Sequence, residues 1–535
     1  MAQRELLLGD EALALGALHA GLSGVYAYPG TPSTEIAEFI QAHPLAAQRG
    51  IHCAWSANEK TAMEEALGMS FAGRRALVCM KHVGMNVAAD AFVNAAMTGA
   101  HGGLVVVAAD DPSMHSSQNE QDSRFYGKFA LIPTFEPATQ QETYDMVQAA
   151  FELSEKFRIP VLMRLTTRMA HSRAVVETRE AREENPMRCP EEEKKRQWVL
   201  MPGNSRVRYK ALLDDNTRFE QEAEESRFNR YIDAPDKSLG IIACGIAYNY
   251  VMENFPQGAP HPVLKISQYP LPADLIRRMA AECQALLIAE EGQPVVEEAV
   301  RGVLPAPVEI HGRLSGQLPR TGELTPDSLR AALGLVPLEA HAASRIVVPR
   351  PPALCQGCGH RDMYAALTEV VREEHPEAKV FSDIGCYTLG WLAPFHAIDT
   401  VVDMGASITM AKGAADAGLR PSIAVIGDST FTHSGMTGLL DAVNERSPIT
   451  VIISDNLTTG MTGGQDSAGT GRLEQICTGL GVDPAHIRVV VPLPKNREEL
   501  KQMIREEIAY EGVSVIIPRR ECIQTAKRHT AAAKK

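Results

Sequence analysis

Two polar segments in the last third of the chain follow apolar runs in a way that suits metal chemistry. Gly427-Asp428-Ser429 comes directly after the run 423–426, and Asp455-Asn456 comes directly after the run 450–454. We expect both runs to be strands of a parallel sheet, and such sheets bind ligands at the carboxyl ends of their strands. Carboxylate and amide oxygens suit Mg²⁺, which also takes oxygens from phosphate groups. The sequence therefore predicts that Asp428, Asn456 and the carbonyl of Thr458 hold Mg²⁺.

The same two segments resemble the thiamine diphosphate motif, in which Gly-Asp-Gly is followed one strand later by Asn-Asn. Ser429 replaces the last glycine of that motif and Asp455 its first asparagine, whereas the metal-binding asparagine is kept as Asn456. The form Gly-Asp-Ser-Thr-Phe is similar to that of the alpha subunits of indolepyruvate:ferredoxin oxidoreductases. The resemblance implies cofactor contacts from Gly427, Asp428, Ser429, Asn456, Thr458, Met461 and Thr462. Without it, two ordinary strand–helix turns remain the alternative.

The first third of the chain carries further matches to this family. The segment Tyr28-Pro29-Gly30-Thr31-Pro32-Ser33 is similar to one whose threonine contacts the substrate carboxylate, which implies that role for Thr31 and places Tyr28, Pro29 and Gly30 beside the cofactor. Within the segment 58–68, the resemblance assigns Glu59 as the carboxylate that activates the aminopyrimidine ring of thiamine. The residues alone favour a surface glutamate on a helix. His82 follows the predicted strand 76–80 and could approach the substrate, although a lone histidine is more often structural.

Four of the ten cysteines stand in the last block of the chain, with Cys355 and Cys358 as a Cys-x-x-Cys pair followed by Cys386 and Cys522. In the pyruvate oxidoreductase relatives, cysteines in these places hold one [4Fe-4S] cluster beside the thiamine, so the resemblance implies the same ligands here. A zinc site on the Cys-x-x-Cys pair, or unligated thiols, are the alternatives. Longer relatives end in a ferredoxin-like segment. The sequence up to Lys535 contains no such segment. We therefore expect electrons to leave through another subunit or directly to a soluble carrier.

The composition is that of an ordinary globular protein. The chain has 535 residues, of which 45% are hydrophobic and 22% charged, and its formal net charge is -13. This acidic balance disfavours nucleic acid and anionic membranes as partners. No apolar run approaches the roughly 20 residues that span a bilayer, and the N-terminus shows no signal-peptide pattern. We therefore expect a cytoplasmic enzyme that binds neither nucleic acid nor membrane.

Strand-like runs alternate with turns and helical patterns along most of the chain, which predicts an α/β fold of three doubly wound domains. By resemblance, two domains are of the thiamine-diphosphate-binding type and one is like the transketolase C-terminal domain. The expected order is a pyrimidine-type domain (1–176), a charged linker or surface excursion (177–235), the transketolase C-terminal-like domain (236–340), a linker (341–353), a diphosphate-binding domain (354–525) and a disordered tail (526–535).

The resemblance implies oxidative decarboxylation of an aryl-2-oxoacid, of the indolepyruvate or phenylpyruvate type, to an acyl-CoA, with electron transfer through the cluster. Implied partners are a smaller beta subunit, CoA, the 2-oxoacid and ferredoxin or another acceptor, in a dimer of alpha–beta pairs. Met461 stands where relatives place an asparagine near the substrate, and this more apolar residue favours aryl substrates. The alternatives are a non-oxidative thiamine-dependent decarboxylase and a non-catalytic subunit that keeps the fold.

Overall fold

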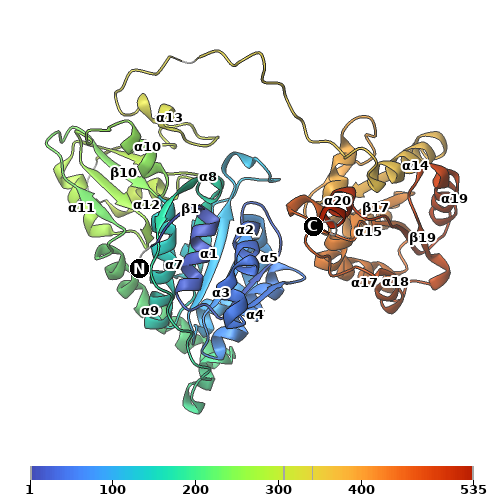
Figure 1. Ribbon diagram of the computed structural model, residues 1–535, viewed down its shortest axis with the longest axis horizontal. Coiled ribbons are helices and arrows are strands. Elements are labelled where there is room, and N and C mark those ends of the chain that lie inside the picture. Colours follow the sequence, from blue (N-terminus) through green and yellow to red (C-terminus); the bar gives the residue numbers. More distant parts are fainter. Residues whose placement is uncertain (1–2, 305–307, 340, 533–535) are drawn as a thin grey trace. The chain divides into compact units, whose positions relative to one another are not determined.

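The computed structural model describes residues 3–304, 308–339 and 341–532. By its internal contacts the chain divides into two compact units, Met1–His341 and Ala342–Lys535. Figure 1 draws the first unit in blue to yellow and the second in yellow to red. Within the described ranges, no helix is long and apolar enough to cross a membrane.

A seven-stranded sheet forms the centre of the first unit. Its strands, in order across the sheet, are β12 (Gln268–Tyr269), β6 (Thr134–Phe135), β7 (Val161–Thr166), β5 (Leu104–Asp110), β4 (Ala76–Lys81), β2 (Gly24–Ala27) and β3 (His52–Trp55). All neighbours are parallel except the edge strand β12, which pairs antiparallel with β6. Every residue of β4 and β5 is buried, as expected for parallel strands that are covered on both faces.

Helices cover both faces of this sheet, so the doubly wound prediction is confirmed for it. One face carries α1 (Gly9–His19), α2 (Thr34–Ala42) and α7 (Gln140–Phe157), and the other carries α4 (Glu59–Phe71) and α5 (His82–Thr98). The connections include α3 (Pro44–Arg49), α6 (Arg124–Ala130) and α8 (Thr167–His171). A separate two-stranded sheet pairs β1 (Arg4–Leu8) with β8 (Arg173–Glu177).

A second sheet completes the first unit. Its order is β14 (Glu309–His311), β13 (Ala285–Ala289), β10 (Gly240–Cys244), β11 (Val263–Ile266) and the antiparallel edge strand β9 (Arg230–Ile232). Its helices are α10 (Ala247–Glu253), α11 (Ala273–Glu282), α12 (Val295–Val303) and α13 (Pro326–Arg330). One hydrophobic core cluster runs from this sheet to the helices of the first sheet, and β12 crosses over to pair there. The two sheets therefore pack as one body.

The segment expected to be a charged linker or surface excursion contains the long helix α9 (Pro202–Glu224). Leu212 and Phe219 of this helix are buried in the core that α4 and α5 share. Most of its remaining residues are exposed. The segment is thus an ordered surface helix held by a few apolar contacts.

A six-stranded, fully parallel sheet forms the second unit. Its order is β16 (Thr400–Val401), β15 (Lys379–Ser382), β17 (Ser422–Gly427), β18 (Ile449–Ser454), β20 (Val513–Pro518) and β19 (Ile487–Val490). One face carries α14 (Gly359–Glu374) and α19 (Arg497–Ile508), and the other α15 (Ala406–Asp416), α17 (Met436–Glu445) and α18 (Leu473–Gly479). Each face has its own core cluster, which again is the doubly wound arrangement.

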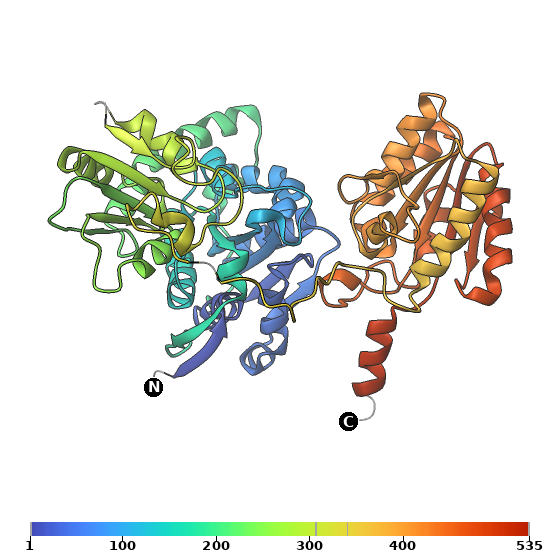
Figure 2. The same ribbon diagram turned by 90° about the horizontal axis from the view of Figure 1, so that it is seen from above.

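The chain after Thr525, expected to be a disordered tail, is helical as far as it is described. Helix α20 (Ile523–Ala532) appears in dark red in Figure 2, projecting from the body of its unit. The guanidinium of Arg528 donates a hydrogen bond to the carbonyl of Gly463. This contact and the helix-favouring alanines of the segment account for the difference. Residues 533–535 of the expected tail lie outside the described ranges.

Candidate active site

Asp428 lies where the sequence predicts it, at the carboxyl end of β17. It begins the short helix α16 (Asp428–Thr430), and only 2% of its surface is exposed. Its Oδ2 atom has no hydrogen-bond partner within the described part of the chain. Burial, and next the charge of Asp455, raise the pKa of Asp428 to about 7. A divalent cation would supply the opposite charge that this carboxylate lacks, so the residue fits a metal ligand.

Asn456 follows β18, the parallel neighbour of β17, and the two strands pair up to Gly427 and Ser454. The structure therefore brings Asn456 to the same edge of the sheet as Asp428. The side-chain oxygen of Asn456 accepts a hydrogen bond from the backbone N–H of Thr458, at 3.1 Å. The tight turn needed for this contact places Leu457 in the left-handed region, at a φ of 62°.

Asp455, which departs from the thiamine motif, is engaged elsewhere. Its Oδ2 accepts a hydrogen bond from Nε of Arg519 at 2.6 Å, and its Oδ1 accepts one from the backbone N–H of Leu457 at 3.1 Å. Arg519 directly follows β20, so this ion pair ties the ends of two neighbouring strands together. The replacement of asparagine by Asp455 therefore leaves the metal-type role to Asn456.

His360 is a site residue to which the sequence reasoning gave no role. It is buried, and burial lowers its pKa to about 4, so the ring is neutral at physiological pH. Its Nδ1 lies 2.6 Å from the hydroxyl of Ser454, and its Nε2 lies 3.4 Å from the amide nitrogen of Asn456. This contact orients the Asn456 amide with its oxygen toward the turn. His360 follows Cys358 by two residues in the sequence, and this closeness to a predicted cluster ligand could have pointed to it.

The remaining predicted cofactor contacts lie in the loops after β17 and β18. A Cβ atom at Gly427 would lie 2.6 Å from the ring of Tyr387, so the close packing here requires glycine. The hydroxyls of Ser429 and Thr459 lie 2.9 Å apart and join the two loops. Thr462 donates a hydrogen bond to the side chain of Gln465 at 2.6 Å. Met461, in the same turn, is 55% exposed.

The four predicted cluster cysteines line one pocket of the second unit, with a cavity volume of about 100 Å³. Cys355 and Cys358 precede α14, Cys386 begins a short 3-10 helix, and Cys522 precedes α20. Burial, and next the charges of Cys358 and Cys522, raise the pKa of Cys386 to about 12. The structure thus gathers four thiols from three distant segments, close enough for their charges to repel.

Asn456 lines this same pocket, beside the cysteines. Its carbonyl accepts a hydrogen bond from the backbone N–H of Cys522 at 3.0 Å. The short turn that carries Asn456 therefore lies both at the sheet edge of Asp428 and in the cysteine pocket.

Glu59 lies at the carboxyl edge of the seven-stranded sheet in the first unit. It is 5% exposed and is the first residue of α4, which Asn58 caps by accepting a hydrogen bond from the backbone N–H of Thr61. A Cβ atom at Gly84 would lie 2.6 Å from Oε1 of Glu59 and 2.7 Å from its Cγ. The glutamate is thus packed against the first turn of α5 and is not on the surface.

The loop that carries Thr31 lies at the same edge. Tyr28 and Pro29 are buried, and Gly30 and Thr31 are partly exposed. The backbone N–H of Gly30 donates to the hydroxyl of Thr34 at 3.0 Å, which fixes the loop at the start of α2. A Cβ atom at Gly30 would lie 3.0 Å from Cβ of Lys81 at the end of β4. Because β2 and β4 are neighbours, the Thr31 loop and the start of α5 come together.

His82 begins α5 and is fully buried. Its Nε2 lies 3.2 Å from the carbonyl oxygen of Asn119, and burial lowers its pKa. Its Nδ1 has no hydrogen-bond partner in the described part of the chain. The ring is therefore a neutral group at the edge where the Thr31 loop lies, and it keeps one nitrogen free for a ligand.

Two family models match the chain. Residues 15–232 match the model described as "Pyruvate flavodoxin/ferredoxin oxidoreductase, thiamine diP-bdg", and residues 383–517 match "Thiamine pyrophosphate enzyme, C-terminal TPP binding domain". The first range holds Thr31 and Glu59, and the second holds Asp428 and Asn456. Fold and site together define a thiamine-diphosphate-dependent 2-oxoacid oxidoreductase.

Curated relatives narrow this class. The chain is 39% identical to indolepyruvate oxidoreductase subunit IorA of Archaeoglobus fulgidus, over 97% of this chain and 86% of that protein. It is equally identical to the protein of the same name in Methanothermobacter marburgensis, over 97% of this chain and 87% of that protein. The chain belongs to the indolepyruvate oxidoreductase subunit IorA family.

A solved structure supports the fold independently. The 2-oxoglutarate:ferredoxin oxidoreductase of Magnetococcus marinus aligns with a TM-score of 0.51 at 15% sequence identity, over 62% of this chain and 65% of that chain. At that identity the likeness concerns the fold alone. It agrees with the predicted α/β class, which is confirmed.

Proposed function

We propose that this chain oxidatively decarboxylates an aryl-2-oxoacid, of the indolepyruvate or phenylpyruvate type, to an acyl-CoA. In this proposal Cys355, Cys358, Cys386 and Cys522 hold one [4Fe-4S] cluster that takes up the electrons. The observation that carries the proposal is the shared pocket, in which the four cysteines stand beside the metal-type residue Asn456. Such proximity suits one-electron transfer from thiamine chemistry to a cluster.

Thiamine diphosphate, when bound, supplies the stabilisation of the carbanion that decarboxylation leaves behind. The chain's own residues bind the cofactor and orient the substrate. Asp428, Asn456 and the carbonyl of Thr458 would hold Mg²⁺ and, through it, the diphosphate. The feature that supports this assignment is Oδ2 of buried Asp428, which has no hydrogen-bond partner within the described part of the chain.

In the first unit, Glu59 would hold a proton at the aminopyrimidine nitrogen, because its carboxylate is buried and fixed by packing against Gly84. Thr31 would orient the carboxylate of the substrate, and Tyr28, Pro29 and Gly30 would form the wall beside the cofactor. His82 would offer its free Nδ1 to the substrate. These roles follow from the family resemblance and from the shared position of the residues at one sheet edge.

The spacing of the cysteines favours a cluster over zinc. Four thiolates at the usual zinc distance of about 2.3 Å would bring their sulfurs to within about 3.8 Å of one another. In the described ranges, the one group of three or more potential ligands within 4.8 Å contains no cysteine. No three of the four sulfurs are therefore that close, and a larger metal centre fits them better.

The relatives support the rest of the proposal. The family members are called indolepyruvate oxidoreductase subunits, which supports an aryl substrate and a second subunit for this chain. The apolar side chain of Met461 at the turn agrees with an aryl group. The Magnetococcus enzyme was solved with coenzyme A bound, which supports CoA as a substrate here. A smaller beta subunit, ferredoxin as acceptor and a dimer of alpha–beta pairs complete the proposal, and the cytoplasmic location stays a prediction.

The test is a product assay on the chain purified without oxygen together with its partner subunit. With indolepyruvate, CoA and a one-electron dye, the proposal predicts CoA-dependent dye reduction and indoleacetyl-CoA. Release of the aldehyde without dye reduction would favour the non-oxidative decarboxylase. Absence of thiamine diphosphate binding would favour a non-catalytic subunit. Pyruvate in place of indolepyruvate serves as the control for the aryl specificity.

A further inference from the structure

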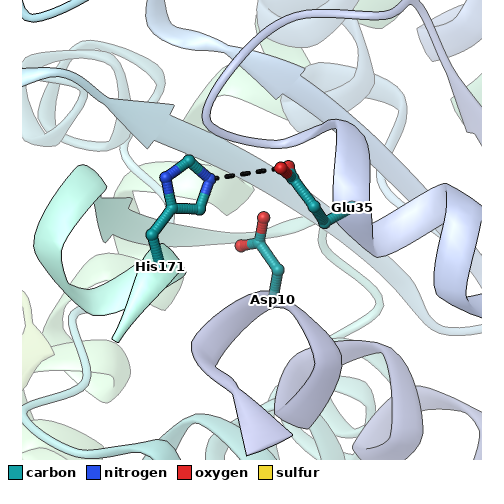
Figure 3. Close-up of side chains that lie close together, drawn as sticks. All are labelled: Asp10, Glu35 and His171. Carbon is teal, nitrogen blue, oxygen red and sulfur yellow. Dashed lines mark ion pairs between the residues drawn. The ribbon is translucent and has the colours of Figure 1, made fainter. Parts of the chain in front are cut away.

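Three side chains of the first unit, none of which is assigned a role above, converge at one place. Asp10 lies in the first turn of α1, Glu35 in the first turn of α2, and His171 ends α8. One ligand atom from each lies within 4.8 Å of the other two. Figure 3 shows the carboxyl group of Asp10 pointing between the imidazole of His171 and the carboxyl of Glu35.

Asp10 makes this group unusual. Its side chain is fully buried, and neither of its carboxyl oxygens has a hydrogen-bond partner within the described ranges. Oε2 of Glu35 has none either. A buried charged group without a partner strongly destabilises a fold, so native proteins pair such groups or use them to coordinate metals.

The nearby positive groups do not balance the two carboxylates. His171 reaches Oε1 of Glu35 at 3.4 Å. Arg173 is engaged with Glu11, at 3.6 Å. A divalent cation would neutralise Asp10 and Glu35 together and would leave His171 free to bind as a neutral imidazole.

We propose that Asp10, Glu35 and His171 bind one divalent transition-metal ion, with Zn²⁺ as the preferred occupant. One imidazole nitrogen and two carboxylates are a donor set that zinc accepts, whereas Ca²⁺ takes six to eight oxygen ligands and Mg²⁺ needs a near-ideal octahedral shell. Imidazole also favours zinc over the harder ions. The side chains of His171 and Glu35 are 33% and 36% exposed, which gives the ion a path from solvent and leaves room for a water ligand.

The ion would join the first turns of α1 and α2 to the end of α8. Glu35 lies four residues after Thr31, and the loop between them is already fixed to the start of α2 through Gly30 and Thr34. Metal binding would therefore stiffen the base of the loop that carries Thr31. The site itself does not depend on the proposed reaction, because its ligands belong to none of the residues assigned to thiamine or to the cluster.

The test is Zn²⁺ binding to the full chain after chelator treatment, measured by elemental analysis and by the thermal midpoint. We expect Asp10→Asn and His171→Gln to lose one zinc per chain, with affinity at the site weakened by more than about a hundredfold. His115→Gln is the matched control, because His115 also faces a glutamate, at 3.2 Å from Glu323, but lies outside any three-ligand group in the described ranges. It should bind zinc as the wild-type chain does.

Co²⁺ separates this site from the cysteine pocket. Co²⁺ at the proposed site gives ligand-field absorption without a thiolate charge-transfer band, and Cys358→Ser should leave that absorption unchanged. Asp10→Asn removes a buried charge, so its metal-free form should melt no lower than wild type, which shows that it folds. Equal zinc content in wild type and Asp10→Asn, or cobalt spectra from thiolate ligands alone, would overturn the proposal.

Discussion

Gly84→Ala tests whether the packing of Glu59 against α5 sets its function. The new Cβ would lie 2.6 Å from Oε1 and 2.7 Å from Cγ of Glu59, whereas ordinary contact begins at 3.4 Å. The carboxylate must therefore move by about 0.8 Å. A misplacement of about 1 Å lowers rates by about 10²-fold. We expect the turnover number with a 2-oxoacid to fall by about that factor.

The matched control is Gly68→Ala in α4, where a Cβ atom meets nothing within 4 Å. Alanine in place of a helical glycine favours the helix by up to about 1 kcal/mol, so Gly68→Ala should melt at or above the wild-type temperature. In Gly84→Ala the overlap with Glu59 opposes this gain by about 1–3 kcal/mol, so its midpoint should lie below that of Gly68→Ala. The assay pairs steady-state dye reduction with hydrogen–deuterium exchange at C2 of bound thiamine. Gly84→Ala and Glu59→Gln should slow both, and Gly68→Ala neither. Wild-type exchange in Gly84→Ala would show that the function of Glu59 does not depend on this packing.

Two further predictions concern binding and stability. Asp428→Asn should weaken Mg²⁺-dependent binding of thiamine diphosphate by at least about tenfold in calorimetry, because the amide cannot balance the ion's charge, whereas the exposed Asp441→Asn should not. Burial, more than two nearby basic groups, lowers the pKa of His19 from 6.5 to about 4. The neutral ring therefore contributes stability above pH 6.5 that is lost as the pH falls toward 4. In urea unfolding, His19→Gln should flatten this slope, and a slope equal to that of the wild-type protein would contradict the assignment.

Local sequence patterns were enough to predict the strands and the candidate functional residues at their carboxyl ends. Strands β4, β17 and β18 are buried over their whole length, and they are followed within two residues by His82, Asp428 and Asn456, as the sequence indicated. Asp428 and Asn456 could be paired in advance because consecutive strands joined by one helix usually lie side by side. The four cysteines needed the family resemblance, since nothing local connects Cys386 to Cys522.

Long-range contacts explain what the sequence did not reveal. His360 contacts an asparagine 96 residues away, and the Asp10 group joins three segments without a local motif. The helix α9 was not predicted from the sequence, because its buried Leu212 and Phe219 stand among many charged residues. Its few apolar positions are enough for packing but too few for a clear helical pattern.

The most direct test of the central claim is the iron and acid-labile sulfide content of the chain, purified without oxygen together with its partner subunit. We expect about four irons and four sulfides per chain. Cys358→Ser should lose them, and Cys189→Ser, which changes an exposed cysteine outside the pocket, should keep them. Thiamine diphosphate bound at one per chain without iron, or iron that survives Cys358→Ser, would contradict a cluster in this pocket.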